Sequence, residues 1–397
     1  MQKHIDYLVI GAGIIGISIG NSLLEKHPKA RVVIADKETT LGAHASGRNS
    51  GVLHAGFYYS PDSLKARFCR DGNAALKEVI ARHSIPIRQT GKVVVTQNLE
   101  ELPRLSALYE RGIANGVKLE LLPATELSKF EPLAKTCGEF LWSPTTAVSD
   151  PVAVIQALAS EFILKGGDLK LSAEIKINDL QEVFLDSQKI EVAQVVNASG
   201  VNALHFAQQF GIGKNYSLLP VLGLYKTISD SKFPLRTLVY PVPNPKNPFL
   251  GVHFTLTTDH KIKIGPTAIP VIGREQYSLI NGFDLRDLRN ATTAVSALAK
   301  NSISNLISLA ATEFPKVFTR NLVINGSKLV PSVPKTNSWV TKKPGLRAQL
   351  VNRNTGEFEQ DFVVEKSGKF IHILNAVSPG WTASVPFSNW VVEKYID

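Results

Sequence analysis

The sequence predicts an α/β protein with two domains, one built on a parallel sheet and the other on a mixed sheet. A chain of 397 residues is long enough to bury more than one hydrophobic core. Residues 6–36 show strand, glycine-rich turn, helix and strand patterns in that order, which is typical of a parallel sheet. Farther along, 89–96 and 236–265 contain strand patterns that are separated by helical ones, and these predict the second sheet.

The composition excludes several broad classes of protein. With 44% hydrophobic and 20% charged residues, the chain is unlike disordered, collagenous or coiled-coil sequences. Its two cysteines, Cys69 and Cys137, are too few for a disulfide framework or a four-thiolate zinc site, so we expect a reducing compartment and no metal site. The start shows no signal-peptide pattern, and no run of about 18 apolar residues occurs. We therefore expect a soluble, cytoplasmic protein.

The charge pattern narrows the possible partners. Lysine and arginine exceed aspartate and glutamate by 44 to 34, a net charge of +10. These cations are spread along the chain, whereas a nucleic-acid-binding protein is expected to carry a basic stripe or a recognisable module, so we exclude nucleic acid. Two kinds of partner remain compatible with the excess of positive charge. One is an anionic membrane surface, through weak peripheral attraction, and the other is a substrate with more than one carboxylate.

The first 36 residues predict a Rossmann-like dinucleotide-binding unit. Gly11, Gly13 and Gly16 follow the strand at 6–10 in the pattern G-x-G-x-x-G. The first glycine permits a tight turn, the second lets the backbone approach a pyrophosphate, and the third lets helix and strand pack closely. The helix N-terminus offers N–H groups to the diphosphate, and Asp36 is placed to accept hydrogen bonds from a ribose. The alternative is an ordinary glycine-rich turn.

Three features favour FAD as the dinucleotide. The motif begins at residue 11, and many flavin enzymes begin with this unit. The strand at 191–197 ends in small residues, which let the chain pass close to a cofactor. Residues 42–59 are dense in Gly, Ser, Asn and His, as in a loop that lies against a ligand, although a solvated loop has a similar composition. The predicted contacts beyond the glycine turn are Lys37, Ser46, Asn49, Ser50, Gly51, Ala198 and Gly200.

Six blocks of sequence carry a family resemblance. They are DYLVIGAGIIG, SGRNSGVLHAGFYYSPDSLKARFC, TGKVVV, YPVPNPKNPFLGVHFT, PGLRAQ and HILNAVSPGWTAS. In this order they resemble the L-2-hydroxyglutarate oxidase/dehydrogenase family, which belongs to the D-amino-acid-oxidase-like group of FAD enzymes. The resemblance implies oxidation of L-2-hydroxyglutarate to 2-oxoglutarate by hydride transfer to flavin N5, without NAD. The stretch 281–338 is not closely similar to the family, and the bulky Trp381 stands where we expect a small residue.

The resemblance also implies how the chain is divided. It predicts an FAD-binding domain of the glutathione-reductase/D-amino-acid-oxidase type and a discontinuous substrate domain with a mixed sheet. We assign 1–83, 140–214 and 339–397 to the FAD-binding domain, and 84–139 and 215–338 to the substrate domain.

Oxidation of a secondary alcohol needs a base for the hydroxyl proton, and histidine is the simplest candidate. His253 and His54 lie in the two most specific blocks. We assign His253 as the base and His54 as a flavin or substrate contact. The structural alternatives are a hydrogen-bonded core histidine for His253 and an anchor of loop backbone for His54. His44 raises a further alternative, since some proteins of this broad fold attach FAD covalently through a histidine nearby.

A dicarboxylate needs cations or several hydrogen-bond donors to hold it. Arg347 in PGLRAQ is the leading candidate because a guanidinium binds a carboxylate in bidentate fashion. The next candidates for binding the carboxylates are Tyr59, Tyr58 and Lys65. If the segment is extended, the two tyrosines point to opposite faces, so at most one of them reaches the ligand.

The C-terminal residues 375–395 predict a loop that leads into a final helix. In this fold the N-terminus of that helix is expected to point at the flavin, where its dipole stabilises the anionic reduced form. A simple helix cap is the alternative. The residues concerned are Ser378, Gly380, Trp381 and Thr382.

Three other functions stay open from the sequence. An amine or amino-acid oxidase, or an oxidase of another 2-hydroxy acid, would use the same fold. A membrane-associated flavoprotein without turnover is the rival from another class. The electron acceptor is equally open, because oxygen, a quinone and a carrier protein all suit these residues.

Overall fold

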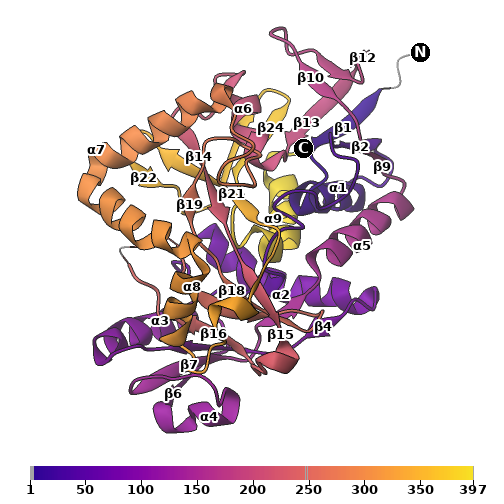
Figure 1. Ribbon diagram of the computed structural model, residues 1–397. Helices are drawn as coiled ribbons and strands as arrows, with labels where there is room; N and C mark the ends of the chain where they lie inside the picture. Colours follow the sequence, from indigo (N-terminus) through magenta and orange to yellow (C-terminus); the bar gives the residue numbers. More distant parts are fainter. Residues whose placement is uncertain (1–3, 246, 248, 397) are drawn as a thin grey trace.

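A computed structural model describes residues 4–245, 247 and 249–396 (Figure 1). Its first sheet has six strands in the order β23-β24-β13-β1-β2-β9, and every adjacent pair except β23–β24 is parallel. The continuous apolar strands suit a parallel sheet that is covered on both faces. The six strands are β1 (Ile5–Ile10), β2 (Val32–Ala35), β9 (Asp168–Lys170), β13 (Val192–Asn197), β23 (Val363–Ser367) and β24 (Phe370–Asn375).

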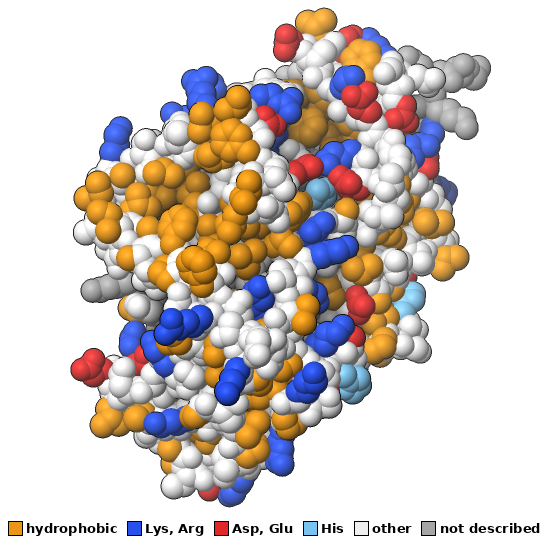
Figure 2. Space-filling view, in the orientation of Figure 1, with side chains coloured by type: hydrophobic (Ala, Val, Ile, Leu, Met, Phe, Trp, Pro, Cys, Tyr) orange, Lys and Arg blue, Asp and Glu red, His pale blue; other side chains and the backbone are white. Residues whose placement is uncertain are grey.

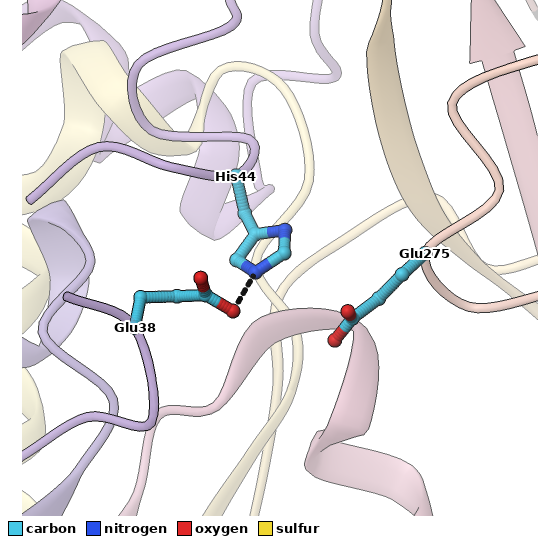
Figure 3. Close-up of side chains that lie close together, drawn as sticks. All are labelled: Glu38, His44 and Glu275. Atoms are coloured by element: carbon cyan, nitrogen blue, oxygen red, sulfur yellow. Dashed lines mark hydrogen bonds and ion pairs between the residues drawn. The ribbon is translucent and has the colours of Figure 1, made fainter. Parts of the chain in front are cut away.

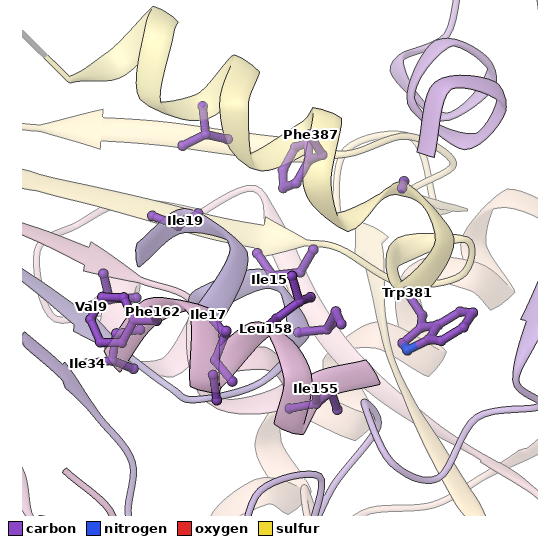
Figure 4. Packing of buried hydrophobic residues seen from close by; sticks show 14 of the residues in the cluster. Val9, Ile15, Ile17, Ile19, Ile34, Ile155, Leu158, Phe162, Trp381 and Phe387 are labelled. Carbon is purple, nitrogen blue, oxygen red and sulfur yellow. The ribbon is translucent and has the colours of Figure 1, made fainter. Parts of the chain in front are cut away.

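Four helices share a large hydrophobic core with this sheet, and Figure 4 shows part of it. The helices are α1 (Ile14–Lys26), α2 (Leu64–Arg82), α5 (Pro151–Leu164) and α9 (Gly380–Tyr395). The sequence offers Ser149 or Asp150 as the cap of α5, with Pro151 in its first turn. In the structure the Asp150 carboxylate caps the helix by accepting hydrogen bonds from two backbone N–H groups, and Pro151 is the first helical residue. The fully buried Ile17, Phe162 and Phe387 bring α1, α5 and α9 together.

The second large sheet is mixed, as the sequence predicts. Its order is β20-β15-β18-β17-β16-β5-β7-β6, with β16 and β5 parallel and the other pairs antiparallel. Helices α3 (Leu102–Ala114) and α8 (Thr319–Ser327) contribute to its core. The strands are β5 (Lys92–Val95), β6 (Glu120–Pro123), β7 (Glu139–Ser143), β15 (Lys226–Ser229), β16 (Leu238–Pro241), β17 (His253–Leu256), β18 (Lys261–Gly265) and β20 (Val340–Thr341).

A third, antiparallel sheet carries the longest helix. Strands β19 (Ile269–Pro270), β14 (Tyr216–Gly223), β21 (Gly345–Asn352) and β22 (Glu357–Phe358) pair in that order. Helix α7 (Leu288–Glu313) packs on β14 and β21 through alanine side chains, and its backbone is non-helical at Ser302. The sequence of 287–314 predicts one long helix, and the structure confirms it, with a kink that the apolar spacing did not indicate.

The remaining elements are short. They are β3 (Val52–Leu53), β4 (Ile87–Arg88), β8 (Ala147–Ser149), β10 (Ile175–Ile177), β11 (Val183–Leu185), β12 (Gln188–Ile190), α4 (Leu127–Phe130) and α6 (Ala203–Gln208). The α/β fold class, with one mainly parallel and one mixed sheet, is confirmed. The domain boundaries remain a prediction. Among the described residues, no helix is long and apolar enough to cross a membrane.

Candidate functional site

A cavity of about 670 Å³ lies at the carboxyl ends of the parallel strands, where α/β proteins commonly bind ligands. Its wall extends from the glycine turn after β1 to the start of α9 and to β21. The predicted residues that line it are Gly11, Gly13, Asp36, Lys37, His44, Ser46, Asn49, Ser50, His54, Ala198, Gly200, Arg347, Ser378, Gly380, Trp381 and Thr382. Six predicted residues lie outside the lining: Gly16, Gly51, Tyr58, Tyr59, Lys65 and His253.

The glycine turn is fixed by close backbone packing. Gly11 has a φ of +103°, which only glycine adopts readily, and a Cβ on Gly16 would lie 1.9 Å from the carbonyl oxygen of Gly11. Gly16 therefore sets how closely α1 approaches β1, as the motif predicts. Gly51 is required for a similar reason, because its Cβ would lie 2.3 Å from the carbonyl oxygen of Ser149.

Two predicted cofactor contacts also hold the turn in place. The Asp36 carboxylate accepts hydrogen bonds from the backbone N–H groups of Ala12 at 2.7 Å and Glu38 at 2.9 Å. The Ser46 hydroxyl accepts one from the N–H of Ile14 at 3.0 Å, in the first turn of α1. The N-terminus of α1 is thus shaped by side chains that line the same cavity.

The start of α9 offers an unused donor to the cavity. Trp381 is buried and lines the wall, and its indole Nε1 has no hydrogen-bond partner among the described residues. The neighbouring Thr382 hydroxyl accepts from the N–H of His54 at 3.2 Å and donates to the carbonyl of Val52 at 3.1 Å. A buried donor without a partner costs free energy unless a ligand satisfies it. Together with the glycine turn, it fits a long dinucleotide such as FAD.

His54 lies in the cavity wall and is held as a neutral imidazole. Burial, and then electrostatic interactions with Lys92, His253 and Arg347, keep the pKa of His54 well below its usual value. Its backbone is anchored by Thr382, Cys69 and Asn73. The ring is therefore unprotonated at neutral pH, as a general base must be.

His253, the residue assigned as base, lies behind the cavity wall. Its Nδ1 is 2.8 Å from the carbonyl oxygen of Gly251, and its ring stacks on Tyr240 with centroids 3.9 Å apart. Because a carbonyl only accepts, Nδ1 carries the proton and Nε2 is the nitrogen that can accept one. Burial lowers the pKa of His253 to about 3, a shift that the nearby Lys92 and Arg347 increase.

Arg347 brings an unpaired cation to the cavity. Its guanidinium lines the wall from β21, with its central carbon 5.7 Å from the centre of the Phe249 ring. Within the described part of the chain, no carboxylate forms an ion pair with it and its side chain makes no hydrogen bond. A guanidinium held in this way is ready to bind an external carboxylate.

Sequence analysis missed Lys92, a buried cation beside both histidines. Its side chain is fully buried, and its Nζ has no hydrogen-bond partner among the described residues. Burial lowers the pKa of Lys92 to about 7. The Nζ lies 4.6–4.7 Å from the ring centres of Phe57, Tyr58 and Tyr240, which we call the aromatic box. The signal in the sequence that could have found Lys92 is its position as a single charged residue at the start of KVVV, an otherwise apolar run.

The predicted tyrosines differ from expectation because they lie in a turn after β3 and not in an extended segment. Tyr58 belongs to the aromatic box, and its buried hydroxyl has no hydrogen-bond partner among the described residues. Tyr59 hydrogen-bonds Ser378, and burial raises the pKa of Tyr59 well above its usual value. Burial lowers the pKa of Lys65 to about 8, against the opposing effect of Asp361.

An ion-pair cluster of four residues lies at the cavity rim: Lys37, Glu38, His44 and Glu275. Figure 3 shows the last three. The His44 Nε2 lies 2.9 Å from a carboxylate oxygen of Glu38, and its Nδ1 lies 2.6 Å from the Tyr277 hydroxyl. The Lys37 ammonium pairs with Glu38 and, at 2.9 Å, with Glu275. The lysine therefore supplies the positive charge that a metal ion would supply. Both nitrogens of His44 are engaged, so we do not assign it a covalent link to flavin.

The lining residues that were not predicted include Arg48, Tyr225 and Tyr277. The Arg48 guanidinium lies 4.1 Å from the centre of the Tyr277 ring, and its Nε donates to the carbonyl of Ala43 at 2.6 Å. These contacts join the 42–59 loop to a segment more than 200 residues away, which no local pattern in the sequence indicates.

Comparison with known proteins identifies similar chains. Residues 6–393 match the model of a family described as FAD dependent oxidoreductase. A mitochondrial L-2-hydroxyglutarate dehydrogenase of Nematostella vectensis is 32% identical over 99% of this chain and 91% of its own. The L-2-hydroxyglutarate dehydrogenase of Salmonella houtenae is 32% identical over 98% of this chain and 92% of its own. The FAD-bound L-alpha-glycerophosphate oxidase structure of Mycoplasma pneumoniae has a TM-score of 0.78 at 21% identity, covering 98% and 94%.

Proposed function

The chain belongs to the family of FAD dependent oxidoreductases, and on this premise we propose that it oxidises L-2-hydroxyglutarate to 2-oxoglutarate. The two relatives that are 32% identical to this chain are named L-2-hydroxyglutarate dehydrogenase. The structural observation that carries the proposal is the unpaired Arg347 guanidinium in the wall of the cavity.

Two cations, the half-buried Arg347 and the buried Lys92, favour a substrate with two negative charges. Arg347 lines the cavity, and Lys92 lies close enough to lower the pKa of both His54 and His253. Charges act strongly through a buried, weakly polarisable environment, so this positive potential attracts a dicarboxylate. Lys65 contributes less, because Asp361 and Glu359 offset its charge.

In the proposed mechanism, FAD would be held by Gly11, Asp36 and Trp381 and would supply a hydride acceptor for the oxidation of the substrate hydroxyl to a carbonyl. Arg347 holds a carboxylate and fixes the orientation of the reacting carbon. His54 in the wall, or His253 behind it through its Nε2, takes the hydroxyl proton. The residue assignments are part of the proposal.

The positive charges near the two histidines also argue against an amino acid as substrate. An amino acid carries an ammonium group, which needs an acceptor or a carboxylate partner in the site. The charged groups that lower the pKa of both His54 and His253 are the cations Lys92 and Arg347. An ammonium group would be repelled there, whereas a hydroxyl group would not.

The cellular compartment and the electron acceptor are also part of the proposal. The two cysteines are free, with Cys69 buried and Cys137 half-buried, which suits the reducing cytoplasm. Oxygen, a quinone and a carrier protein are the acceptor classes to compare. After the substrate has reduced the enzyme, the rate of flavin reoxidation with each of them identifies the acceptor.

The visible spectrum of the purified protein tests the function. We expect flavin absorbance that bleaches on anaerobic addition of L-2-hydroxyglutarate, but not of its D-enantiomer or of glycine. Bleaching by an amino acid alone would overturn the substrate assignment and leave the cofactor in place. Absence of flavin after reconstitution with FAD would overturn the cofactor assignment as well.

A further inference from the structure

One irregular segment leaves the third sheet and passes along the wall of the cavity. Residues 271–284 run from β19 to the short helical turn that precedes α7, and we call this segment the strap. Among its residues, all of which the structure describes, Val271 is the one buried apolar side chain. Arg274 and Tyr277 line the cavity. Because the strap has so little core of its own, its position depends on the polar contacts that it makes.

The strap is folded on itself, which gives it a defined shape. The side-chain carbonyl of the buried Gln276 accepts hydrogen bonds from the backbone N–H groups of Ile272 at 3.2 Å and Gly273 at 3.1 Å. The two ends of the strap also touch, since a Cβ on Gly273 would lie 2.2 Å from the carbonyl oxygen of Gly282. We therefore expect the strap to move as one unit.

Consecutive residues of the strap reach to opposite sides of the glycine turn. Arg274 Nη1 donates a hydrogen bond to the side-chain oxygen of Asn202 at 2.9 Å, and Asn202 follows β13. Glu275 forms an ion pair at 2.9 Å with Lys37, which follows β2. Strand β1 lies between β13 and β2 in the sheet. The strap therefore crosses the carboxyl end of β1, where the turn at Gly11 begins.

Tyr277 attaches the strap to the 42–59 loop. Its hydroxyl lies 2.6 Å from His44 Nδ1, and the two rings stack with centroids 5.8 Å apart. The central carbon of the Arg48 guanidinium lies 4.1 Å from the centre of the Tyr277 ring. In Figure 3, Glu275 comes from a separate segment and faces His44. The strap is thus attached to three parts of the cavity wall that are far apart in the sequence.

The attachments of the strap are partly open to solvent. The side chains of Lys37 and Glu275 are 49% and 42% exposed, and Figure 2 shows acidic and basic side chains beside a histidine at the surface. Residues 279–283 of the strap are exposed as well. Exposed ion pairs and single hydrogen bonds each contribute little to stability, so several weak contacts hold the strap closed.

We propose that the strap is a gate that retains FAD, and that it must lift before the cofactor enters or leaves. The strap crosses the glycine turn and the N-terminus of α1, which is where the diphosphate of a dinucleotide is expected to bind. Its attachments are to side chains of the protein itself. A weaker attachment therefore speeds both entry and exit of FAD, and leaves the equilibrium dissociation constant almost unchanged.

Exchange of bound FAD in the full-length holoenzyme tests the gate without any use of the substrate. An excess of isotopically labelled FAD is added, and the bound label is measured over time after rapid desalting. The dissociation constant comes from the fraction of FAD that stays bound when the holoenzyme is diluted. The variants are Glu275→Gln, which removes the ion pair with Lys37, Tyr277→Phe, which removes the hydroxyl and keeps the ring, and the two changes combined.

Two control variants remove the same kinds of group without affecting an attachment of the strap. Arg286→Gln removes an exposed ion pair, formed at 2.8 Å with Asp284 just beyond the cavity wall. Tyr109→Phe removes a tyrosine hydroxyl that packs against the core of the second sheet. Both controls should exchange FAD at the wild-type rate.

We expect each single variant to exchange FAD about two- to tenfold faster than the wild type, and the combined variant to be faster than either. The dissociation constant should stay within about twofold of the wild-type value, because entry and exit change together. An unchanged exchange rate in the combined variant would overturn the proposal. A dissociation constant that rises by the same factor as the exchange rate would also overturn it, and would make these side chains direct ligands of FAD.

Discussion

The Nζ atom of Lys92 lies 4.7 Å from the centre of the Tyr240 ring, and the same ring stacks on the imidazole of His253. A buried cation and a candidate base therefore share one aromatic partner. The positive charge lowers the pKa of His253, while the ring shields the charge from water. We therefore expect the protonation state of Lys92 to affect the pKa of His253 and, through it, the reaction in the cavity.

The variant Lys92→Met tests that link. With a pKa of about 7, Lys92 is charged below neutral pH and neutral above it. We expect the wild-type kcat/KM to fall as the pH rises through about 7, and the variant to lack this decline and to be at least about tenfold less active below it. A pH profile measures this. Lys118→Met at an exposed site is the control, and a decline above pH 7 that persists in Lys92→Met would contradict the prediction.

Replacement of the histidines tests the base. We expect His54→Ala or His253→Ala to lower kcat by a factor of about 100 to 10,000 while FAD stays bound. Because burial lowers the pKa of both residues, the base stays unprotonated in mild acid. On the acid side of the pH profile, activity should therefore fall well below pH 6.5 and not near it. The exposed His260→Ala should have no effect. A variant with near-normal kcat removes that histidine as base.

Arg347→Lys tests the carboxylate clamp. Lysine keeps the charge but cannot bind a carboxylate through two parallel hydrogen bonds. We expect KM for L-2-hydroxyglutarate to rise by roughly ten- to a hundredfold, with a smaller change in kcat. Arg353→Lys, on the exposed end of the same hairpin, is the control. Unchanged steady-state kinetics would place the clamp elsewhere.

Gly16→Ala tests the cofactor turn by steric exclusion. A methyl group there would lie 1.9 Å from the carbonyl oxygen of Gly11, so α1 must move away from β1. We expect loss of most bound FAD and an unfolding free energy lower by about 1–3 kcal/mol. The ratio of flavin to protein absorbance and a denaturant titration measure the two effects. The Cβ of Gly13→Ala meets only the Ser46 hydroxyl at 3.0 Å, so this variant should lower the unfolding free energy less, although a Cβ there also obstructs the approach to the pyrophosphate. An equal loss of unfolding free energy in both variants would refute this explanation.

Trp381→Phe tests the unused donor at the start of α9. The change keeps an aromatic ring and removes the indole N–H, which has no partner among the described residues. If FAD accepts this hydrogen bond, its dissociation constant should rise by roughly two- to tenfold. Trp390→Phe, in the same core but outside the cavity lining, should leave FAD affinity unchanged. Equal affinities of Trp381→Phe and the wild type would show that the donor is not used.

Local features of the fold could be predicted because their causes are local. The strand at β1, the turn at Gly11 and the helix α1 follow from apolar runs and from backbone freedom at glycine. Asp150 and Pro151 mark the start of α5 for the same reason. The kink at Ser302 was not predictable, since the apolar spacing of α7 continues on both sides of it.

The sequence by itself determined the cofactor turn and the blocks that resemble one family, because these are contiguous stretches whose chemistry is set by neighbours in the chain. Only the tertiary structure decided that His54 lines the cavity while His253 lies behind it, and that Lys92 is enclosed by three rings. Those relationships join β3, β5, β16 and β17, which are far apart in sequence. Their physical origin is burial: how far a side chain is removed from water, and beside which charge, is settled only when distant strands pack together.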